Sequence, residues 1–234
     1  MKKVAILQSN YIPWKGYFDL INSVDEFIIY DSMQFTRRDW RNRNKIKTKE
    51  GLQWLSIPVN VKGNYFQTIN ETTVCDNKWI KNHINAIHHS YRKAKCFEGY
   101  LDWLQDIYSS CINENRLSKI NRVFIRAICD VLKINTKISF SEDFVLLDGK
   151  TERLIGLCKD VEADYYLSGP AAKDYIVDSL FQEAGIELSY IDYSGYPIYT
   201  QLHGGFEHGV SIIDLILNEG ENARSFMKSF RDNK

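Results

Sequence analysis

Near its N-terminus the chain reads Val4-Ala5-Ile6-Leu7-Gln8-Ser9-Asn10-Tyr11, an apolar run that ends abruptly in polar residues. Four apolar residues bounded by turn signals predict a buried strand, here over residues 3–8. A polar, aromatic loop follows and leads through Pro13 into a predicted helix over 15–23. In α/β proteins a ligand commonly binds where a strand opens into such a loop.

Strand and helix patterns alternate along most of the remaining sequence. Strands are predicted over 26–31, 54–59, 136–140, 164–167 and 186–191, and helices over 151–161, 173–184 and 211–218. No element is predicted for the polar, basic segment 32–49, and 60–77 is expected to be a loop with an extended piece near 72–74. The alternation predicts an α/β fold with a mostly parallel, Rossmann-like layered sheet.

The middle of the chain has a different pattern. From Trp79 to Ile134 apolar residues recur every three or four positions with little Gly or Pro, which predicts three helices. We therefore expect one compact domain in three parts: an N-terminal α/β half (1–78), an inserted helical subdomain (79–134) and a C-terminal α/β half (135–234).

Length and charge restrict the classes of protein to consider. The 234 residues include 30 basic and 30 acidic side chains, so no global field favours nucleic acid or an anionic membrane. No segment approaches the roughly 18 apolar residues of a membrane span, and the apolar run after Lys3 is too short for a signal peptide. These features predict a cytoplasmic protein, and they leave its oligomeric state open.

Several common sites are missing from the sequence. The five cysteines are widely spaced without a C-x-x-C pair, so buried, reduced thiols are expected. His83, His88 and His89 lack the spacing of a helical metal site, and none is predicted. No G-x-G-x-x-G follows a strand, and Gly149-Lys150-Thr151 ends like a P-loop but has Phe144 in place of the first glycine.

Polar residues follow several predicted strands at the point where each strand ends. They are Gln8, Asn10 and Tyr11 after the first strand, Asp31, Met33 and Gln34 after the second, and Ser168 and Gly169 after a later one. Because the carboxyl ends of parallel strands share one edge, these residues are expected to form a site. Backbone N–H groups of Ser168 to Lys173 could also bind an anion, and a plain turn into a helix explains that segment equally well.

A basic block follows the second strand. Thr36-Arg37-Arg38-Asp39-Trp40-Arg41-Asn42-Arg43-Asn44 places four arginines and a tryptophan in nine residues. Guanidinium groups suit phosphates and carboxylates, and the neutral chain favours a small anion as the ligand. The alternative is a basic loop that is simply exposed to solvent. The presence of Trp40, Asn42 and Asn44 among the arginines favours a functional site over this alternative.

These motifs resemble the WbqC-like family. Val4 to Asp19 is similar to its signature V-A-I-x-Q-x-N-Y-x-P-W-x-G-Y-F-D, and Asp31 to Asn44 to its block D-x-x-Q-F-x-R-R-x-W-x-N-R-N. Further similar positions are Trp79, His83, Tyr165 to Gly169, Tyr175, Tyr196-Pro197, Phe206 and Ser211 to Leu215. Ser9, where the family often has proline, and Ile198, where glutamine is common, depart from the pattern.

The resemblance implies an enzyme of bacterial surface-polysaccharide synthesis, including the O-antigen of lipopolysaccharide. Such an enzyme would transfer an acyl or aminoacyl group, such as glycyl, to the amine of a nucleotide-linked amino sugar. The diphosphate would bind Arg37, Arg38, Arg41 or Arg43, and sugar hydroxyls would bind Gln8, Asn10, Asp31 and Gln34. Rings of Tyr11, Trp14, Tyr17 or Trp40 would stack on the sugar or base. Asp31 is the first candidate for the base and His83 the second.

Two other functions stay open. The opening strand, loop and helix resemble, by analogy only, nucleotidyltransferase-like enzymes such as pantothenate synthetases. In that case the cofactor would be ATP with magnesium, bound by Asn10 to Gly16 and Ser168-Gly169, in an amide ligase with another substrate. The third possibility is a non-catalytic protein that binds a nucleotide sugar.

Overall fold

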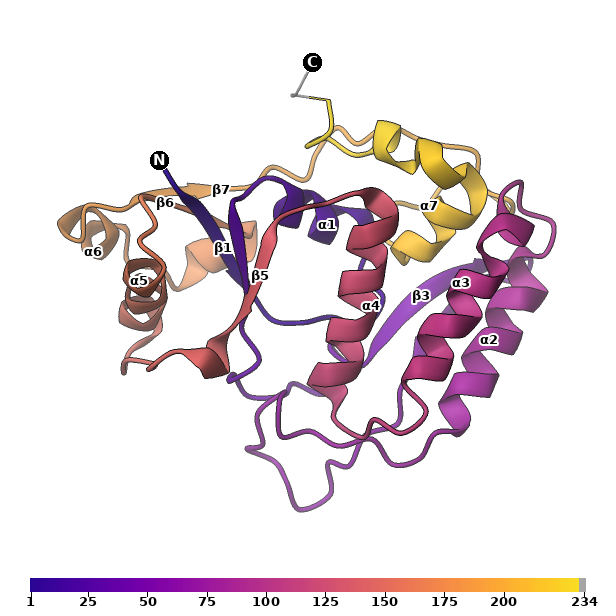
Figure 1. Cartoon of the computed structure of the whole chain (residues 1–234), viewed down its shortest axis with the longest axis horizontal. Coiled ribbons are helices and arrows are strands. Elements are labelled where there is room, and N and C mark those ends of the chain that lie inside the picture. The colour runs from indigo at the N-terminus through magenta and orange to yellow at the C-terminus, as the bar shows by residue number, and fades with distance from the viewer. Residues whose placement is uncertain (232–234) are drawn as a thin grey trace.

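A five-stranded, all-parallel sheet is the centre of the structure, a computed structural model that describes residues 1–231 (Figure 1). Its strands are β1 (Lys3–Leu7), β2 (Glu26–Ile29), β5 (Lys137–Phe140), β6 (Tyr165–Ser168) and β7 (Glu187–Tyr190), in the order β5-β2-β1-β6-β7. The chain runs from β1 to β2 and β5 on one side and then returns to β6 on the other. The change of direction therefore falls between β1 and β6, and the predicted α/β class is confirmed.

Helices cover both faces of this sheet. Ala5 and Phe27 pack in a cluster with α1 (Lys15–Asn22), whereas Val4 and Ile28 pack with α5 (Lys150–Asp160) and α6 (Asp178–Glu183). Alternate residues of a strand point to opposite faces, so both faces of β1 and β2 must be apolar. This explains why the two strands are continuous apolar runs in the sequence.

The helical segment packs on the α1 face of the sheet. It consists of α2 (Lys78–Tyr91), α3 (Phe97–Ser110) and α4 (Leu117–Leu132), as the apolar periodicity predicts. In Figure 1, α4 lies nearest the sheet, with α3 and α2 beyond it. These helices and α7 (Ile212–Glu219) share one apolar cluster with α1, so the core continues from the sheet into the helices.

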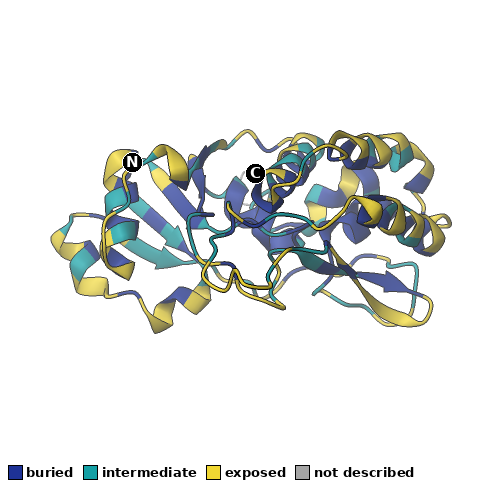
Figure 2. Cartoon of the chain, turned by 90° about the horizontal axis from the view of Figure 1, so that it is seen from below, coloured by how far each residue is buried: buried dark blue, intermediate teal, exposed yellow. Residues whose placement is uncertain are grey.

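The chain end is fastened to the first helix. The carboxylate of Asp19 on α1 is buried and accepts hydrogen bonds from the backbone N–H groups of Lys228 (2.9 Å) and Ser229 (3.0 Å). Figure 2 shows buried and intermediate residues along the central strands and on the inward sides of the helices, with exposed residues on outer helix surfaces and loops. Within residues 1–231, no helix is long and apolar enough to cross a membrane.

A two-stranded antiparallel hairpin corrects the sequence prediction for residues 32–59. It consists of β3 (Arg43–Thr48) and β4 (Gly51–Ser56), whereas a single strand over 54–59 was expected. Ile46 and Leu55 point into the core, and the positive φ of Gly51 (115°) allows the tight turn. Only one large apolar residue alternates with the charged residues of β3, which hid the strand in the sequence.

The predicted helix over 173–184 is also shorter than expected. The chain forms a 3-10 turn, η2 (Pro170–Asp174), and α6 begins only at Asp178. Val177, just before α6, has an extended backbone that interrupts the helix. Two further 3-10 turns are η1 (Ser141–Asp143) and η3 (Gly220–Phe226).

Candidate functional site

A cavity of about 380 Å³ opens where β1 and β6 end side by side. Gln8 and Asn10 line it from the loop after β1, and Ser168 and Gly169 from the end of β6 and the turn after it. The hydroxyl of Ser168 is directed inward and donates to the Tyr166 hydroxyl (3.2 Å), which leaves the backbone around Gly169 to face the cavity. The cavity thus lies at the switch point, where the strand-end argument placed a site.

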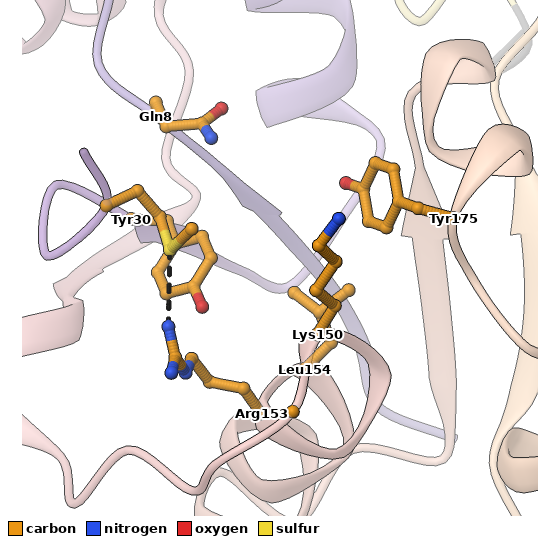
Figure 3. A pocket seen from close by; sticks show the side chains of 8 residues that line it. Gln8, Tyr30, Lys150, Arg153, Leu154 and Tyr175 are labelled. Atoms are coloured by element: carbon orange, nitrogen blue, oxygen red, sulfur yellow. Dashed lines mark hydrogen bonds between the residues drawn. The ribbon is translucent and has the colours of Figure 1, made fainter. Parts of the chain in front are cut away.

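A second cavity of about 360 Å³ adjoins the first and shares Gln8, Tyr30, Leu154 and Tyr175 with it. Lys150 and Arg153 reach into it from the first turns of α5, and Figure 3 shows the Lys150 amine directed toward the Tyr175 ring. Arg153 is held in place because its Nε donates to the Leu147 carbonyl (2.8 Å) and its Nη1 contacts the Met33 sulfur (3.5 Å).

The backbone at the start of α5 contributes less than these two side chains. Gly149 has a φ of 88°, and a Cβ built there would fall 2.1 Å from Oε2 of Glu152. The Glu152 carboxylate therefore already lies against the helix N-terminus. Lys150 and Arg153, and not the helix end, are therefore the groups in this cavity that are suited to an anion.

A third cavity of about 290 Å³ lies at the opposite end of the first one and shares Asn10 and Trp14 with it. Its other lining residues are Pro13, Trp40, Asn44, His208 and Gly209. The Trp14 indole separates the two cavities and is braced on its other sides by the rings of Tyr193 (5.1 Å between centroids) and Tyr196 (5.7 Å). The three cavities together form one cleft along the carboxyl edge of the sheet.

Cations, and no carboxylates, line the cleft. Arg41, Lys150 and Arg153 contribute three positive side chains. Among the residues that the structure describes, no Asp or Glu lines any of the three cavities. Asp39 is the nearest acidic partner of Arg41 (3.6 Å) and lies outside the lining. The cleft is therefore suited to an anionic ligand.

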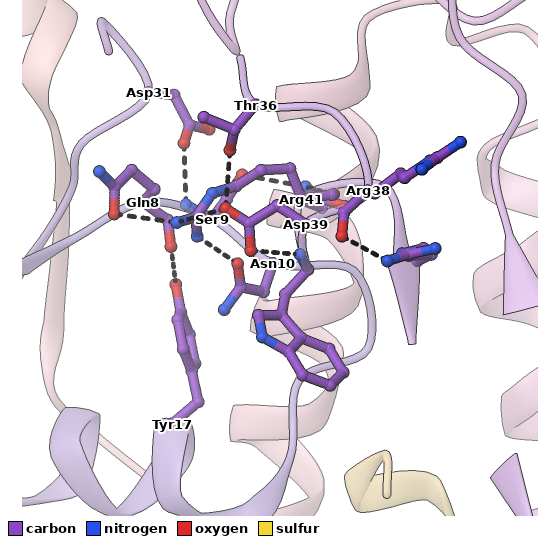
Figure 4. Close-up of polar contacts among 12 residues, drawn as sticks. Gln8, Ser9, Asn10, Tyr17, Asp31, Thr36, Arg38, Asp39 and Arg41 are labelled. Atoms are coloured by element: carbon purple, nitrogen blue, oxygen red, sulfur yellow. Dashed lines mark hydrogen bonds and ion pairs between the residues drawn. The ribbon is translucent and has the colours of Figure 1, made fainter. Parts of the chain in front are cut away.

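A polar network fixes the loop after β1 (Figure 4). Arg41 donates to the side chains of Asn10 and Gln8, the latter at 3.3 Å. The Tyr17 hydroxyl donates to the Gln8 carbonyl (3.1 Å), and the Tyr17 pKa is raised by burial. Arg41 thus acts from within the basic block as the group that shapes this wall of the cleft.

Asp31 lies behind the loop and not in the cleft. It is fully buried, and its two oxygens accept hydrogen bonds from the Ser9 N–H (2.8 Å) and the Ser118 hydroxyl. Burial raises its pKa, and the hydrogen bonds from Ser118 and Ser9 act in the opposite direction. In this geometry Asp31 positions the Ser9 backbone, and its catalytic role stays a prediction.

His83 and Tyr11 meet in the core between α2 and the loop. The Tyr11 hydroxyl contacts Nδ1 of His83 (2.8 Å) and the Tyr108 hydroxyl (2.6 Å), and all three side chains are buried. Burial lowers the pKa of His83 to about 4. Neither Tyr11 nor His83 is among the residues that line the three cavities.

Gln34 and several residues of the basic block lie away from the cleft. Arg37 and Arg38 are exposed, and the Arg43 guanidinium stacks on Trp54 (4.1 Å) while bonding to the Arg38 carbonyl. Gln34 donates to the Tyr65 carbonyl (2.9 Å), and Asn42 donates to the Ile57 carbonyl (2.8 Å). These five residues are not among those that line the three cavities.

The structure therefore places some of the predicted site residues in the lining of the cleft and others outside it. Those that line the cleft are Gln8, Asn10, Trp14, Tyr17, Trp40, Ser168, Gly169 and Tyr175. Lining residues that sequence reasoning missed include Tyr30, Lys150, Arg153, Tyr193 and His208. The Gly149-Lys150-Thr151 start of a helix was the available signal for two of them. Within residues 1–231, no three His, Cys, Asp or Glu side chains are grouped to hold a metal ion.

Comparison with known proteins gives one family and one curated relative. The WbqC-like protein family matches residues 8–226. The uncharacterized protein Rv1507c of Mycobacterium tuberculosis is 51% identical over 231 residues, which covers 99% of this chain and 100% of the relative. No solved structure matches the chain at a significant level.

Proposed function

Because this chain belongs to the WbqC-like protein family, we propose that it is an enzyme of bacterial surface-polysaccharide synthesis. Its substrate is a nucleotide-linked amino sugar, and the reaction transfers an acyl or aminoacyl group, such as glycyl, to the sugar amine. The observation that carries the proposal is the cleft charge: Arg41, Lys150 and Arg153 line it without any acidic side chain among the described residues. A diphosphate is the anionic part of such a substrate.

The order of the cavities suits the parts of this substrate. Lys150 and Arg153 would bind the diphosphate, and the half-exposed Tyr175 ring would stack on the base. The amide groups of Gln8 and Asn10 would bind sugar hydroxyls, with Arg41 fixing both amides. The amine would then point toward Trp14 and the third cavity. Asp31 holds the Ser9 backbone behind this contact surface.

Calorimetry with UDP-glucosamine as the probe tests the binding step. Charge-assisted hydrogen bonds contribute about 1.5–3 kcal/mol each, so Lys150→Ala or Arg153→Ala should weaken binding roughly tenfold or more. Lys159→Ala is the matched control, because Lys159 lies exposed at the other end of the same helix. Equal affinity in Lys150→Ala, Arg153→Ala and the control would refute the assignment of the phosphate site.

An ATP-dependent amide ligase is the second candidate. Tyr175 and the two cations of α5 would accept adenine and phosphates as readily as another nucleotide. Titration of ATP with and without magnesium separates the two: ATP binding without UDP-glucosamine binding would favour the ligase. Binding of UDP-glucosamine, without consumption of any acyl donor, would favour a non-catalytic binding protein.

A further inference from the structure

The third cavity has the composition of a reaction compartment and not of a phosphate site. The residues that line it include three with aromatic rings, Trp14, Trp40 and His208, together with Pro13. Two side-chain amides also line the cavity, and that of Asn44 is already hydrogen-bonded within the protein. Its Nδ2 donates to the Ile12 carbonyl (2.9 Å), and its Oδ1 accepts from the Lys45 N–H (2.8 Å). The cavity therefore offers aromatic surface and one imidazole.

His208 lies in a loop whose backbone is held by hydrogen bonds both before and after it in the sequence. Gln201 binds the backbone of Glu207 twice, accepting from its N–H (2.8 Å) and donating to its carbonyl (2.9 Å). After the loop, the backbone N–H of Ser211 donates to the Lys45 carbonyl, and the backbone N–H of Ile212 donates to the Pro13 carbonyl. The Phe206 ring lies 4.5 Å from the imidazole, edge-on. His208 is thus exposed to the cavity while its backbone is anchored to the cleft.

Acyl transfer to an amine requires a group that accepts a proton near neutral pH. The titratable side chains that line the three cavities are Tyr17, Tyr30, Arg41, Lys150, Arg153, Tyr175, Tyr193 and His208. Arginine and lysine side chains act as hydrogen-bond donors and not as acceptors. Burial raises the pKa of Tyr17, Tyr30, Tyr175 and Tyr193 further above neutrality. Among the described residues that line the cleft, His208 alone has a free base at pH 7.

We infer that His208 is the catalytic proton acceptor and that the compartment between Trp14 and Trp40 is where the amide bond forms. This inference rests on the proposed function. The amine nitrogen attacks the carbonyl carbon of an acyl thioester or acyl phosphate, and a C–N bond forms as the bond to the leaving group breaks. One N–H proton passes to the imidazole, which returns it to the departing thiolate or phosphate oxygen.

The surroundings of His208 lower the pKa of its imidazole. Burial lowers its pKa, the ammonium of Lys15 on α1 lowers it further, and Glu207 in its own loop raises it. Two further cations contact residues that line the same cavity: Lys45 lies over the Trp40 ring (5.8 Å), and Arg41 is bonded to Asn10. The rate should therefore fall only when the pH drops below the ordinary pKa of histidine, near 6.5.

The first test compares His208→Gln with His203→Gln, a matched control in the same loop whose Nε2 is already bonded to the Ser90 carbonyl (2.7 Å). UDP-glucosamine is the acceptor, with acetyl-coenzyme A or acetyl phosphate as the donor. His208→Gln should bind UDP-glucosamine within about twofold of wild type and lose transfer by about 100-fold or more. It should also lose the acidic limb of the pH profile, while His203→Gln keeps both.

The second test does not depend on the donor. Diethyl pyrocarbonate should modify His208 in the free protein, and UDP-N-acetylglucosamine, whose acetamide resembles the product, should protect it. UDP alone should not protect it, because the diphosphate site lies at the far end of the cleft. If the protein consumes neither donor, protection from diethyl pyrocarbonate alone tests whether His208 lies at the site of the acceptor amine.

Two outcomes would overturn the inference and leave the proposed function standing. One is transfer by His208→Gln at the wild-type rate. The other is binding of UDP-N-acetylglucosamine without protection of His208. Failure of the wild-type protein to bind either nucleotide sugar would instead remove the proposed function itself.

Discussion

The Trp14 indole lies so close over Gly16 that a Cβ on residue 16 would fall 2.3 Å from its Cζ2 atom. The glycine is therefore required by a neighbouring side chain and not by its own backbone angles. Trp14 is also the wall that two cavities of the cleft share. The P-W-x-G-Y signature thus encodes a packing contact that shapes the cleft.

Gly16→Ala should destabilise the protein and move Trp14. Overpacking costs about 1–3 kcal/mol, which exceeds the gain of up to about 1 kcal/mol from replacing a helical glycine. Urea unfolding and tryptophan emission would measure both effects. Gly99→Ala in α3 is the matched control, since nothing lies within 4 Å of its Cβ position and a gain of about 0.5–1 kcal/mol is expected. Equal stability of the two variants would contradict the contact.

Asp31→Ala should lose about 1–3 kcal/mol, because it leaves the buried Ser9 N–H without its acceptor. Asp31→Asn keeps an acceptor oxygen and should lose less. If Asp31 acts only by positioning, Asp31→Asn should also retain most of its transfer activity. Loss of activity in Asp31→Asn with an unchanged thermal melt would instead support the predicted catalytic role.

The pH dependence of stability offers a separate check on Asp31. Burial raises its pKa above the ordinary 3.8, so the folded protein holds this proton more tightly than the unfolded chain. The stabilisation is complete below that value and is lost as the pH rises through the folded pKa. Between about pH 4 and 7, Asp31→Asn should lose less stability than wild type. Asp130→Asn, at an exposed position, should follow wild type.

His83 should have the opposite effect on acid stability. Its pKa is lowered by burial from 6.5 to about 4, so the unfolded chain takes up this proton first as the pH falls. Stability therefore decreases below pH 6.5, by up to about 1.4 kcal/mol per pH unit. From pH 7 to pH 5 wild type should lose about 2 kcal/mol more than His83→Gln in urea titrations. A similar difference for His89→Gln, exposed on the same helix, would contradict the assignment.

The rate of cysteine alkylation should differ between exposed and buried thiols. The structure has five free cysteines: Cys111, Cys129 and Cys158 are buried as expected, Cys96 is half-buried, and Cys75 is exposed, contrary to expectation. Burial raises the pKa of Cys111 to about 11 and those of Cys129 and Cys158 to about 12. Iodoacetamide at pH 8 should label Cys75 first and the three buried thiols only in urea. Early labelling of Cys129 would show that α4 opens locally.

Apolar pattern was sufficient to predict the sheet and the helical segment. Continuous apolar runs identified β1 and β2, and three-four periodicity identified α2 to α4, because both signals depend on burial. The hairpin was missed because β3 has a single large apolar residue, Ile46, between two lysines, and one of them, Lys47, is itself buried. Its pairing partner, β4, lies close in sequence, but its exposed Leu52 and Trp54 concealed the inward face.

The candidate site was predictable only where it depends on strand ends. Gln8, Asn10, Ser168 and Gly169 follow directly from the parallel order of β1 and β6. Residue type alone could not distinguish a buried Asp31 from an accessible one, since that difference depends on Ser118 in a distant helix. Lys150, Arg153 and His208 reach the cleft from elements whose position relative to the sheet is set by tertiary packing.

The bonds from Asp19 to the backbone of Lys228 and Ser229 have a consequence for biosynthesis. The first helix is translated early, yet it acquires these partners only after residues 228 and 229 have been made. The Trp14 wall precedes that helix directly, so a nascent chain on the ribosome carries an incomplete cleft. Binding in this cleft should therefore begin only after translation has passed Ser229.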